Sequence, residues 1–143
     1  MISGSIDIHN FLSKLPFGTT PLNEKHYIIR PGKTTSFLGP QTKLNLRCTS
    51  DSHVISENGI PKEINITPHD WSKPVNKIDE TAMIHDFLYK NAEEESNETK
   101  ILNDKHNADI FMLNALEEIK TNTFSDNIPW VEDGRFLIKL IKI

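Results

Sequence analysis

Three polar side chains that could carry out acid–base chemistry lie close together in one predicted helix. His85 and Tyr89 continue a helical stripe that starts with Ile78 and Ala82, so both are expected to face inward. Asp86 lies about 100° away around the helix, at the edge of that stripe. A histidine and a tyrosine on an inward face need a hydrogen-bonding partner elsewhere in the chain.

A second predicted helix offers that partner; it is clear over about residues 104–120, and its start could lie earlier. Its apolar stripe consists of Leu102, Lys105, Asp109, Met112 and Leu116. A buried Asp109 carboxylate requires donors, and antiparallel packing of the two helices would bring His85 and Tyr89 to it. Such a group is either a structural pair in the core or a histidine base that is oriented by an acid.

A Gly39-Pro40 turn lies in the segment SFLGPQTKLNLR, residues 36–47. Successive backbone carbonyls in such a turn can converge on one point. Calcium is bound by backbone carbonyls together with one or two carboxylates, and Asp86 could supply a carboxylate. Most Gly-Pro turns are plain turns, so this segment alone does not decide between a calcium loop and an ordinary turn.

Together these segments resemble the secreted phospholipases A2. HDFLY at 85–89 matches the H-D-x-x-Y helix motif of that family, and FLGPQ at 37–41 resembles its calcium loop, aromatic-x-Gly-x-Gly. The closer likeness is to the disulfide-free branch at the start of parvovirus minor capsid proteins, with which the chain shares LPF, GPQTKL and HNADIF. The resemblance covers roughly residues 11–120.

The resemblance implies calcium-dependent hydrolysis of the sn-2 ester of glycerophospholipids. His85 would be the general base that takes a proton from the attacking water. Asp109 would accept a hydrogen bond from the other imidazole nitrogen and fix its tautomer, and Tyr89 would hold Asp109. In the viral relatives this activity breaches an endosomal membrane during entry.

The implied calcium site consists of Asp86 and the backbone carbonyls of Phe37, Gly39 and Gln41, with the Gly39 N–H helping to stabilise the oxyanion. The family usually has a second loop glycine where this chain has Gln41. If that position needs a positive φ, glutamine strains it and weakens calcium binding. An alternative function is therefore a binding module with the phospholipase A2 fold and impaired catalysis.

We expect one mainly α domain over residues 1–143, with a phospholipase A2-like core of two antiparallel helices and a calcium-binding loop. Cys48 is the only cysteine, so no intrachain disulfide can form. The first helix should start after an N-cap at Asn76, with Asp79 three residues later completing a box-like signal, and it should end near Lys90. We expect residues 1–35 to be irregular, residues 36–75 to be mostly loop with one short strand over 62–66, and residues 121–143 to form an extension.

The formal net charge of −4 argues against binding to nucleic acid and leaves a neutral lipid surface or a small molecule open. No run of 18 apolar residues predicts a membrane span, so the expected partner is a phospholipid membrane surface bound peripherally. The N-terminus lacks the pattern of a signal peptide. With the resemblance, this indicates a location in a virion or inside a host cell, in the context of a viral capsid.

Further segments leave alternatives open. The C-terminal RFLIKLIKI is a strand or a short amphipathic helix. It could dock on a membrane, pack on the core or contact another subunit. It could also continue into a capsid-like protein, and the chain would then be a structural or interaction domain. Trp71 could line a membrane-docking rim or lie in the core. His106 could join Asp109 and His85 in a metal site. Cys48 is expected to be a plain thiol.

Overall fold

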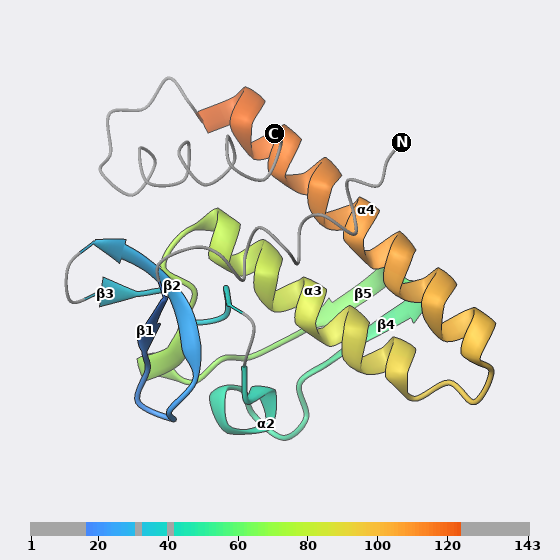
Figure 1. The fold of residues 1–143 in the computed structure, drawn as a ribbon, viewed down its shortest axis with the longest axis horizontal. Helices are drawn as coiled ribbons and strands as arrows, with labels where there is room; N and C mark the ends of the chain where they lie inside the picture. The colour runs from blue at the N-terminus through green and yellow to red at the C-terminus, as the bar shows by residue number, and fades with distance from the viewer. Residues whose placement is uncertain (1–16, 31–32, 40–41, 124–143) are drawn as a thin grey trace.

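Two antiparallel helices run obliquely across the molecule (Figure 1). The computed structural model describes residues 17–30, 33–39 and 42–123. Helix α3 spans Lys77–Glu93, helix α4 spans Glu98–Thr123, and residues 94–97 reverse the chain between them. Because the connection is so short, the two helices pack side by side over most of the length of α3.

Helix α3 begins at the cap that the sequence predicts. The Asn76 side chain accepts a hydrogen bond from Asp79 N at 2.8 Å, which satisfies one N–H of the first turn. Asp79 and Glu80 occupy the first turn and Lys90 the last, an arrangement that complements the helix dipole. The helix continues beyond the expected end near Lys90 and stops at Glu93.

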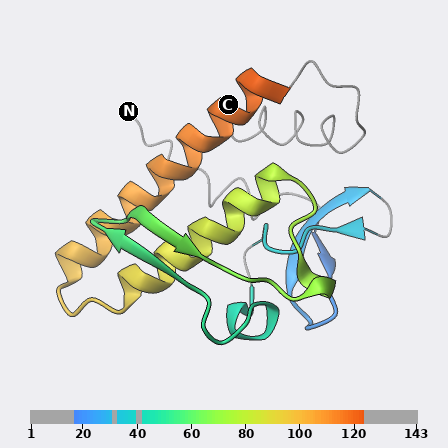
Figure 2. The same cartoon turned by 180° about the vertical axis from the view of Figure 1, so that it is seen from behind.

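A β-hairpin covers one face of the helix pair, as the two opposite views show (Figures 1 and 2). Strand β4 spans His53–Glu57 and pairs antiparallel with β5, Ile60–Asn65. Asn58 and Gly59 link the strands with φ angles of 54° and 82°. Two positive φ values in a two-residue loop define a type I′ turn, which Asn-Gly adopts with little strain and which matches the twist of the strands.

A second, three-stranded antiparallel sheet lies beside the N-terminal part of α3 (Figure 1). Its strand order is β1-β2-β3, and its strands are β1 (Phe17–Thr19), β2 (Lys25–Arg30) and β3 (Lys33–Thr34). Two short helical segments complete the described chain: α2 (Leu44–Arg47) and the 3₁₀ helix η1 (Asp70–Ser72).

The hydrophobic core lies where α3 and α4 meet the hairpin and the loop after β3. Its buried members are Phe37, Leu38, Cys48, Val54, Ile78, Ala82, Met83, Phe87, Leu88, Ala108, Met112 and Leu116. Phe37 and Leu38 come from the loop rather than from a helix, and they are 0% and 1% exposed. The core therefore fixes the loop against α3 at the point where the sequence predicts a calcium site.

A buried ion pair joins the three-stranded sheet to α2. Glu24 and Arg47 are 1% and 2% exposed, and Arg47 Nη2 lies 2.6 Å from Glu24 Oε1. Arg47 Nε also donates to the carboxylate, and Arg47 Nη1 donates to the Ser36 carbonyl at 2.8 Å. Thr20 Oγ1 and Lys43 N donate to the remaining positions of the Glu24 carboxylate. Both charges are thus fully compensated by hydrogen bonds.

The expectation of a mainly α chain holds only in part, because the described residues combine three α-helices with small antiparallel sheets and about half of them are helical. Residues 17–19, 25–30 and 33–34, expected to be irregular, form β1, β2 and β3. The expectation of irregular structure came from the Pro and Gly residues of this segment, but pairing between the strands outweighs their local preference for turns. Within 36–75, the strand expected over 62–66 is β5, and its partner β4 was not predicted. The LPF entry apart from Phe17 and the RFLIKLIKI tail lie outside the described residues.

The stripe predicted for the second helix is only partly right. The helix starts at Glu98, and its buried positions are Asp104, Ala108, Asp109, Met112 and Leu116. Leu102, expected to face inward, is 68% exposed. It lies about 120° around the helix from Ala108, which is fully buried against α3. The buried face of α4 is therefore centred near Ala108 and not on Leu102.

Glu24→Gln should lower the free energy of unfolding at pH 7 by roughly 3–5 kcal/mol, because it leaves Arg47 buried without its counter-charge. Burial raises the pKa of Glu24, but hydrogen bonds from Arg47, Lys43 N and Thr20 outweigh that effect and hold the pKa below its ordinary value. The pair's stabilisation is therefore present above the ordinary glutamate pKa and is lost as the pH falls through the folded value. Urea unfolding from pH 7 to pH 3 measures both effects.

Glu95→Gln provides the control, since Glu95 is exposed in the connection between α3 and α4. Its unfolding free energy should stay within about 0.5 kcal/mol of the wild type. Equal stability of the two variants at pH 7 would show that the Glu24–Arg47 pair contributes nothing net.

Candidate active site

His85 and Asp109 meet across the interface between α3 and α4. His85 Nε2 lies 2.6 Å from Asp109 Oδ1, and the two residues are 5% and 4% exposed. The antiparallel helices bring them level, because His85 lies near the middle of α3 and Asp109 near the middle of α4. A short contact between a histidine nitrogen and a buried carboxylate oxygen is the geometry that fixes one imidazole tautomer.

Tyr89 completes this group one helical turn after His85. Its hydroxyl donates to Asp109 Oδ1 at 2.9 Å and Oδ2 at 3.0 Å, and its ring centroid lies 4.6 Å from that of His85. Burial and the negative charge of Asp109 raise the pKa of Tyr89 far above its ordinary value, so the hydroxyl remains a donor. Lys105 Nζ lies 5.2 Å from the Tyr89 ring centroid and 3.0 Å from Glu93 Oε2.

This arrangement has a defined chemical capacity. With Nε2 engaged by Asp109, Nδ1 is the nitrogen of His85 through which a proton could be taken up. The Asp109 charge would then stabilise the resulting imidazolium. Tyr89 keeps Asp109 in one rotamer by contacting both of its oxygens.

Asp86 follows His85 in the chain but faces a different environment. The residue is half-buried, yet its Oδ2 is shielded from solvent and has no hydrogen-bond partner among the described residues. Burial raises the pKa of Asp86 well above its ordinary value; a hydrogen bond with the Thr42 side chain opposes this shift, and the charges of Asp79 and Glu24 add to it. A shielded carboxylate oxygen of this kind requires either a proton or a cation.

The loop before Thr42 is the segment that could supply the remaining oxygens around such a cation. Phe37 is fully buried, and its carbonyl accepts a 3.2 Å hydrogen bond from Thr42 Oγ1, which leaves its second lone pair for another partner. Gly39 packs against β2 so closely that an added Cβ would lie 2.2 Å from the Lys25 carbonyl oxygen. Gln41, the third expected carbonyl ligand, lies outside the described residues.

One direct observation indicates that these residues fit a hard cation such as calcium. It is the shielded Asp86 oxygen, which lies beside Thr42 at the end of this loop. Oxygen ligands drawn from one carboxylate and several backbone carbonyls are what calcium accepts. A soft transition metal would need nitrogen or sulfur ligands. Among the described residues, no three His, Cys, Asp or Glu side chains come together as a metal site.

Asp79 positions the loop, and the sequence pattern did not identify this role. Its fully buried carboxylate accepts hydrogen bonds from the backbone N–H groups of Ser36, Phe37, Leu38 and Val75, at 2.7, 2.8, 3.1 and 3.0 Å. The sequence suggested only that Asp79 belongs to the N-terminal box of α3. The local cap does form, but through the Asp79 N–H, while the side chain turns to a segment more than 40 positions away.

The other candidate residues take no part in this group. His106 is exposed on α4 and does not join His85 and Asp109 in a metal cluster. Cys48 is buried, and burial raises the pKa of its thiol to about 11, so it remains a thiol near neutral pH. Trp71 is 53% exposed, which excludes the core alternative, and the Arg47 guanidinium carbon lies 5.1 Å from its ring centroid.

No protein-family model, curated protein or solved structure matches this chain. The likeness to the phospholipases A2 therefore rests on the residues quoted above. Within the part of the chain that the structure describes, no helix is both long enough and apolar enough to cross a bilayer.

Asp79→Asn should destabilise the fold by about 3 kcal/mol, the upper range for a hydrogen bond to a charged group. An asparagine has one acceptor oxygen, and its NH₂ group would face N–H donors of the loop. Urea unfolding measures the loss, and amide hydrogen exchange at 36–38 should become faster. Asp70→Asn is the matched control, because the Asp70 side chain is fully exposed. Unchanged exchange at 36–38 would show that Asp79 does not hold the loop.

Asp86→Asn should abolish stabilisation by calcium. In the wild type, calcium at about 100 times its dissociation constant should stabilise the folded state by about 2.7 kcal/mol. In calcium-free buffer the variant should be at least as stable as the wild type, because an amide removes the charge of a carboxylate whose Oδ2 is shielded and has no donor. Thermal unfolding with calcium and with a chelator provides the measurement, and Asp51→Asn, at an exposed position, is the control. An equal calcium shift in Asp86→Asn would place the ion elsewhere.

Proposed function

We propose that this chain is a calcium-dependent lipid-ester hydrolase of the phospholipase A2 type. The observation that carries the proposal is the 2.6 Å contact between His85 Nε2 and Asp109 Oδ1 in a buried setting, with Tyr89 bound to the same carboxylate. The contact alone would also suit a structural pair. Its combination with the shielded Asp86 oxygen, one residue from the base, favours a hydrolytic site.

The proposed reaction uses His85 as a general base. A water molecule attacks the sn-2 ester carbonyl while His85 Nδ1 takes its proton, so a carbon–oxygen bond forms and an imidazolium results. Asp109 stabilises that imidazolium and keeps the ring oriented. The tetrahedral intermediate then collapses, the ester carbon–oxygen bond breaks, and the proton passes from Nδ1 to the leaving glycerol oxygen. The products are a free fatty acid and a lysophospholipid.

The proposed calcium ligands are Asp86 and the backbone carbonyls of Phe37, Gly39 and Gln41. Bound there, calcium would polarise the ester carbonyl and offset the charge that develops on its oxygen. The Gly39 N–H would donate to the same oxygen. Asp79 holds the N–H groups of residues 36–38, which orients the carbonyls of this loop before the ion arrives.

The finer fold assignment belongs to the same proposal: a phospholipase A2-like core of two antiparallel helices with a calcium-binding loop and no disulfides. Support comes from the pairing of α3 with α4 and from the packing of Phe37 and Leu38 against them. The substrate class implies peripheral contact with a phospholipid surface. A role in membrane breach during viral entry is supported by the resemblance to the parvovirus domains alone.

Gln41 favours one alternative, a binding module that keeps this fold but has lost catalysis. If position 41 requires a positive φ, glutamine would strain the loop and weaken calcium binding. Such a protein would still contain the His85–Asp109 pair, because that pair lies in the helical interface and not in the loop. The two functions therefore differ in turnover and not in the described geometry.

His85→Gln should reduce phospholipid hydrolysis by at least about 100-fold, the usual contribution of a general base. Glutamine has a similar reach and can still donate to Asp109, so the fold should survive. The measurement is fatty-acid release from phosphatidylcholine vesicles with calcium and with a chelator. His106→Gln is the control, since His106 is exposed on α4 and should keep the wild-type rate.

A folded His85→Gln variant that hydrolyses vesicles at the wild-type rate would contradict the mechanism. A wild type that binds calcium and vesicles but releases no fatty acid would support the binding module instead. Activity that persists in the chelator would remove calcium from the proposal.

A further inference from the structure

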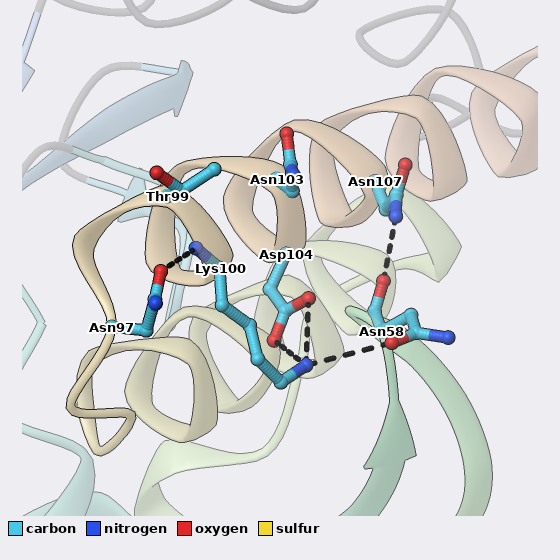
Figure 3. A pocket seen from close by; sticks show the side chains of 7 residues that line it. All are labelled: Asn58, Asn97, Thr99, Lys100, Asn103, Asp104 and Asn107. Carbon is cyan, nitrogen blue, oxygen red and sulfur yellow. Dashed lines mark hydrogen bonds and ion pairs between the residues drawn. The ribbon is translucent and has the colours of Figure 1, made fainter.

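A polar crevice of about 690 Å³ lies where the turn between β4 and β5 meets the first turns of α4 (Figure 3). Its lining consists of four asparagines, one threonine, one lysine and one aspartate. On α4 the contributing positions include 100, 103, 104 and 107, which share one helix face. Asp109 lies about 140° around the helix from Asp104, so the crevice and the candidate active site occupy different faces of α4.

The wall formed by the hairpin turn is fixed to the helix. Gly59 is buried with a φ of +82°, and a Cβ there would lie 2.1 Å from the Asp104 carbonyl oxygen. Asn107 Nδ2 donates to the Asn58 carbonyl at 2.7 Å, as Figure 3 shows. Because the turn contacts α4 through its backbone atoms, the crevice is already formed before a ligand binds.

A charge pair in the crevice restricts what it can bind. The Asp104 side chain is only 9% exposed, and Lys100 Nζ lies 3.1 Å from its Oδ2 and 3.5 Å from Asn58 Oδ1 (Figure 3). Lys100 occupies the position that a metal cation would take beside Asp104, and Asp104 cancels the charge that would attract an anion. No aliphatic or aromatic residue lines the crevice, and the apolar part of its wall comes from carbon atoms of these polar residues, so their polar groups select the ligand.

We propose that this crevice binds a neutral saccharide. A sugar hydroxyl both donates and accepts, and Asn103 offers an amide donor and an amide acceptor to match it. Asn58 and Asn97 use their Oδ1 atoms to accept from Lys100 and keep their NH₂ groups as donors. Asn107 donates to the Asn58 carbonyl and keeps its Oδ1 as an acceptor. Asp104 can accept from hydroxyls, and Lys100 can donate to a ring or hydroxyl oxygen. An adjoining hollow of about 370 Å³ shares Asn58, Lys100 and Asp104, so a second sugar unit has room beside the first.

The experiment is a titration of the full chain followed by ¹H–¹⁵N correlation spectra in a chelator, so that the candidate calcium site plays no part. The probes are D-glucose, D-galactose and N-acetyl-D-glucosamine, and glycerol at the same concentration is the control for non-specific solvation. At least one sugar should shift the amides of 58–59 and 100–107 in a saturable way, with a dissociation constant of about 1–10 mM, as expected for a ligand of this size.

Asn103→Ala tests the site without disturbing the fold. Asn103 is exposed, and its side chain makes no hydrogen bond within the part of the chain described, so its removal should leave the melting temperature unchanged. The variant should bind the sugar about three- to tenfold more weakly, the effect of losing one hydrogen-bonding group. Asn114→Ala, at an exposed asparagine further along α4 and outside the crevice, should bind like the wild type.

Three outcomes would overturn the proposal: no saturable shift with any of the three sugars, shifts that glycerol reproduces, or equal affinities of the Asn103 and Asn114 variants. Because no catalytic residue or ion is involved, each of these outcomes leaves the proposed hydrolase activity untouched.

Discussion

Four backbone N–H groups converge on the carboxylate of Asp79, and the arrangement of the candidate active site depends on this contact. Three of them belong to the loop at Ser36, Phe37 and Leu38, and the fourth to Val75 just before α3. The first turn of α3 thus carries both a helix cap and the anchor of a distant loop. Burial raises the pKa of Asp79, and the four N–H groups oppose that shift by stabilising the charge. Core packing of Phe37 and Leu38, together with hydrogen bonds to the Ser36 and Phe37 carbonyls, adds to this contact in holding the loop beside α3.

The buried carboxylates differ in how fully their charges are compensated. Asp79 has four N–H donors, Glu24 has a buried arginine, and Asp109 has His85 and Tyr89. Asp86 is the exception among the described residues, because one of its oxygens is shielded and has no donor. A fold that satisfies its other buried acids so completely retains this imbalance at a cost in stability. The proposed calcium ion would remove that cost, which is why the exception supports a binding role for Asp86.

With a single cysteine, this chain must join the segments that precede α3 without intrachain disulfides. Polar contacts between distant segments serve instead: the Glu24–Arg47 pair ties the three-stranded sheet to α2, and Asp79 ties the loop to α3. The Asn58-Gly59 turn likewise contacts α4 through its backbone. These contacts close long loops. The Glu24–Arg47 pair and the contacts of Asp79 with the loop are buried, where competition from water is weak, whereas the Asn107–Asn58 hydrogen bond is exposed.

Periodicity and capping in the sequence determined α3, its N-cap at Asn76, and the inward stripe that carries His85 and Tyr89, because these features depend on neighbours within a few residues. The same reasoning placed Asp109 on a facing helix but misjudged the centre of that helix's contact, since packing around Ala108 decides it. Only the tertiary structure decided the partners of Asp79 and Glu24 and the pairing of β4 with β5. Those contacts join positions far apart in the chain, and local sequence carries no signal for which distant donors a buried acid will meet.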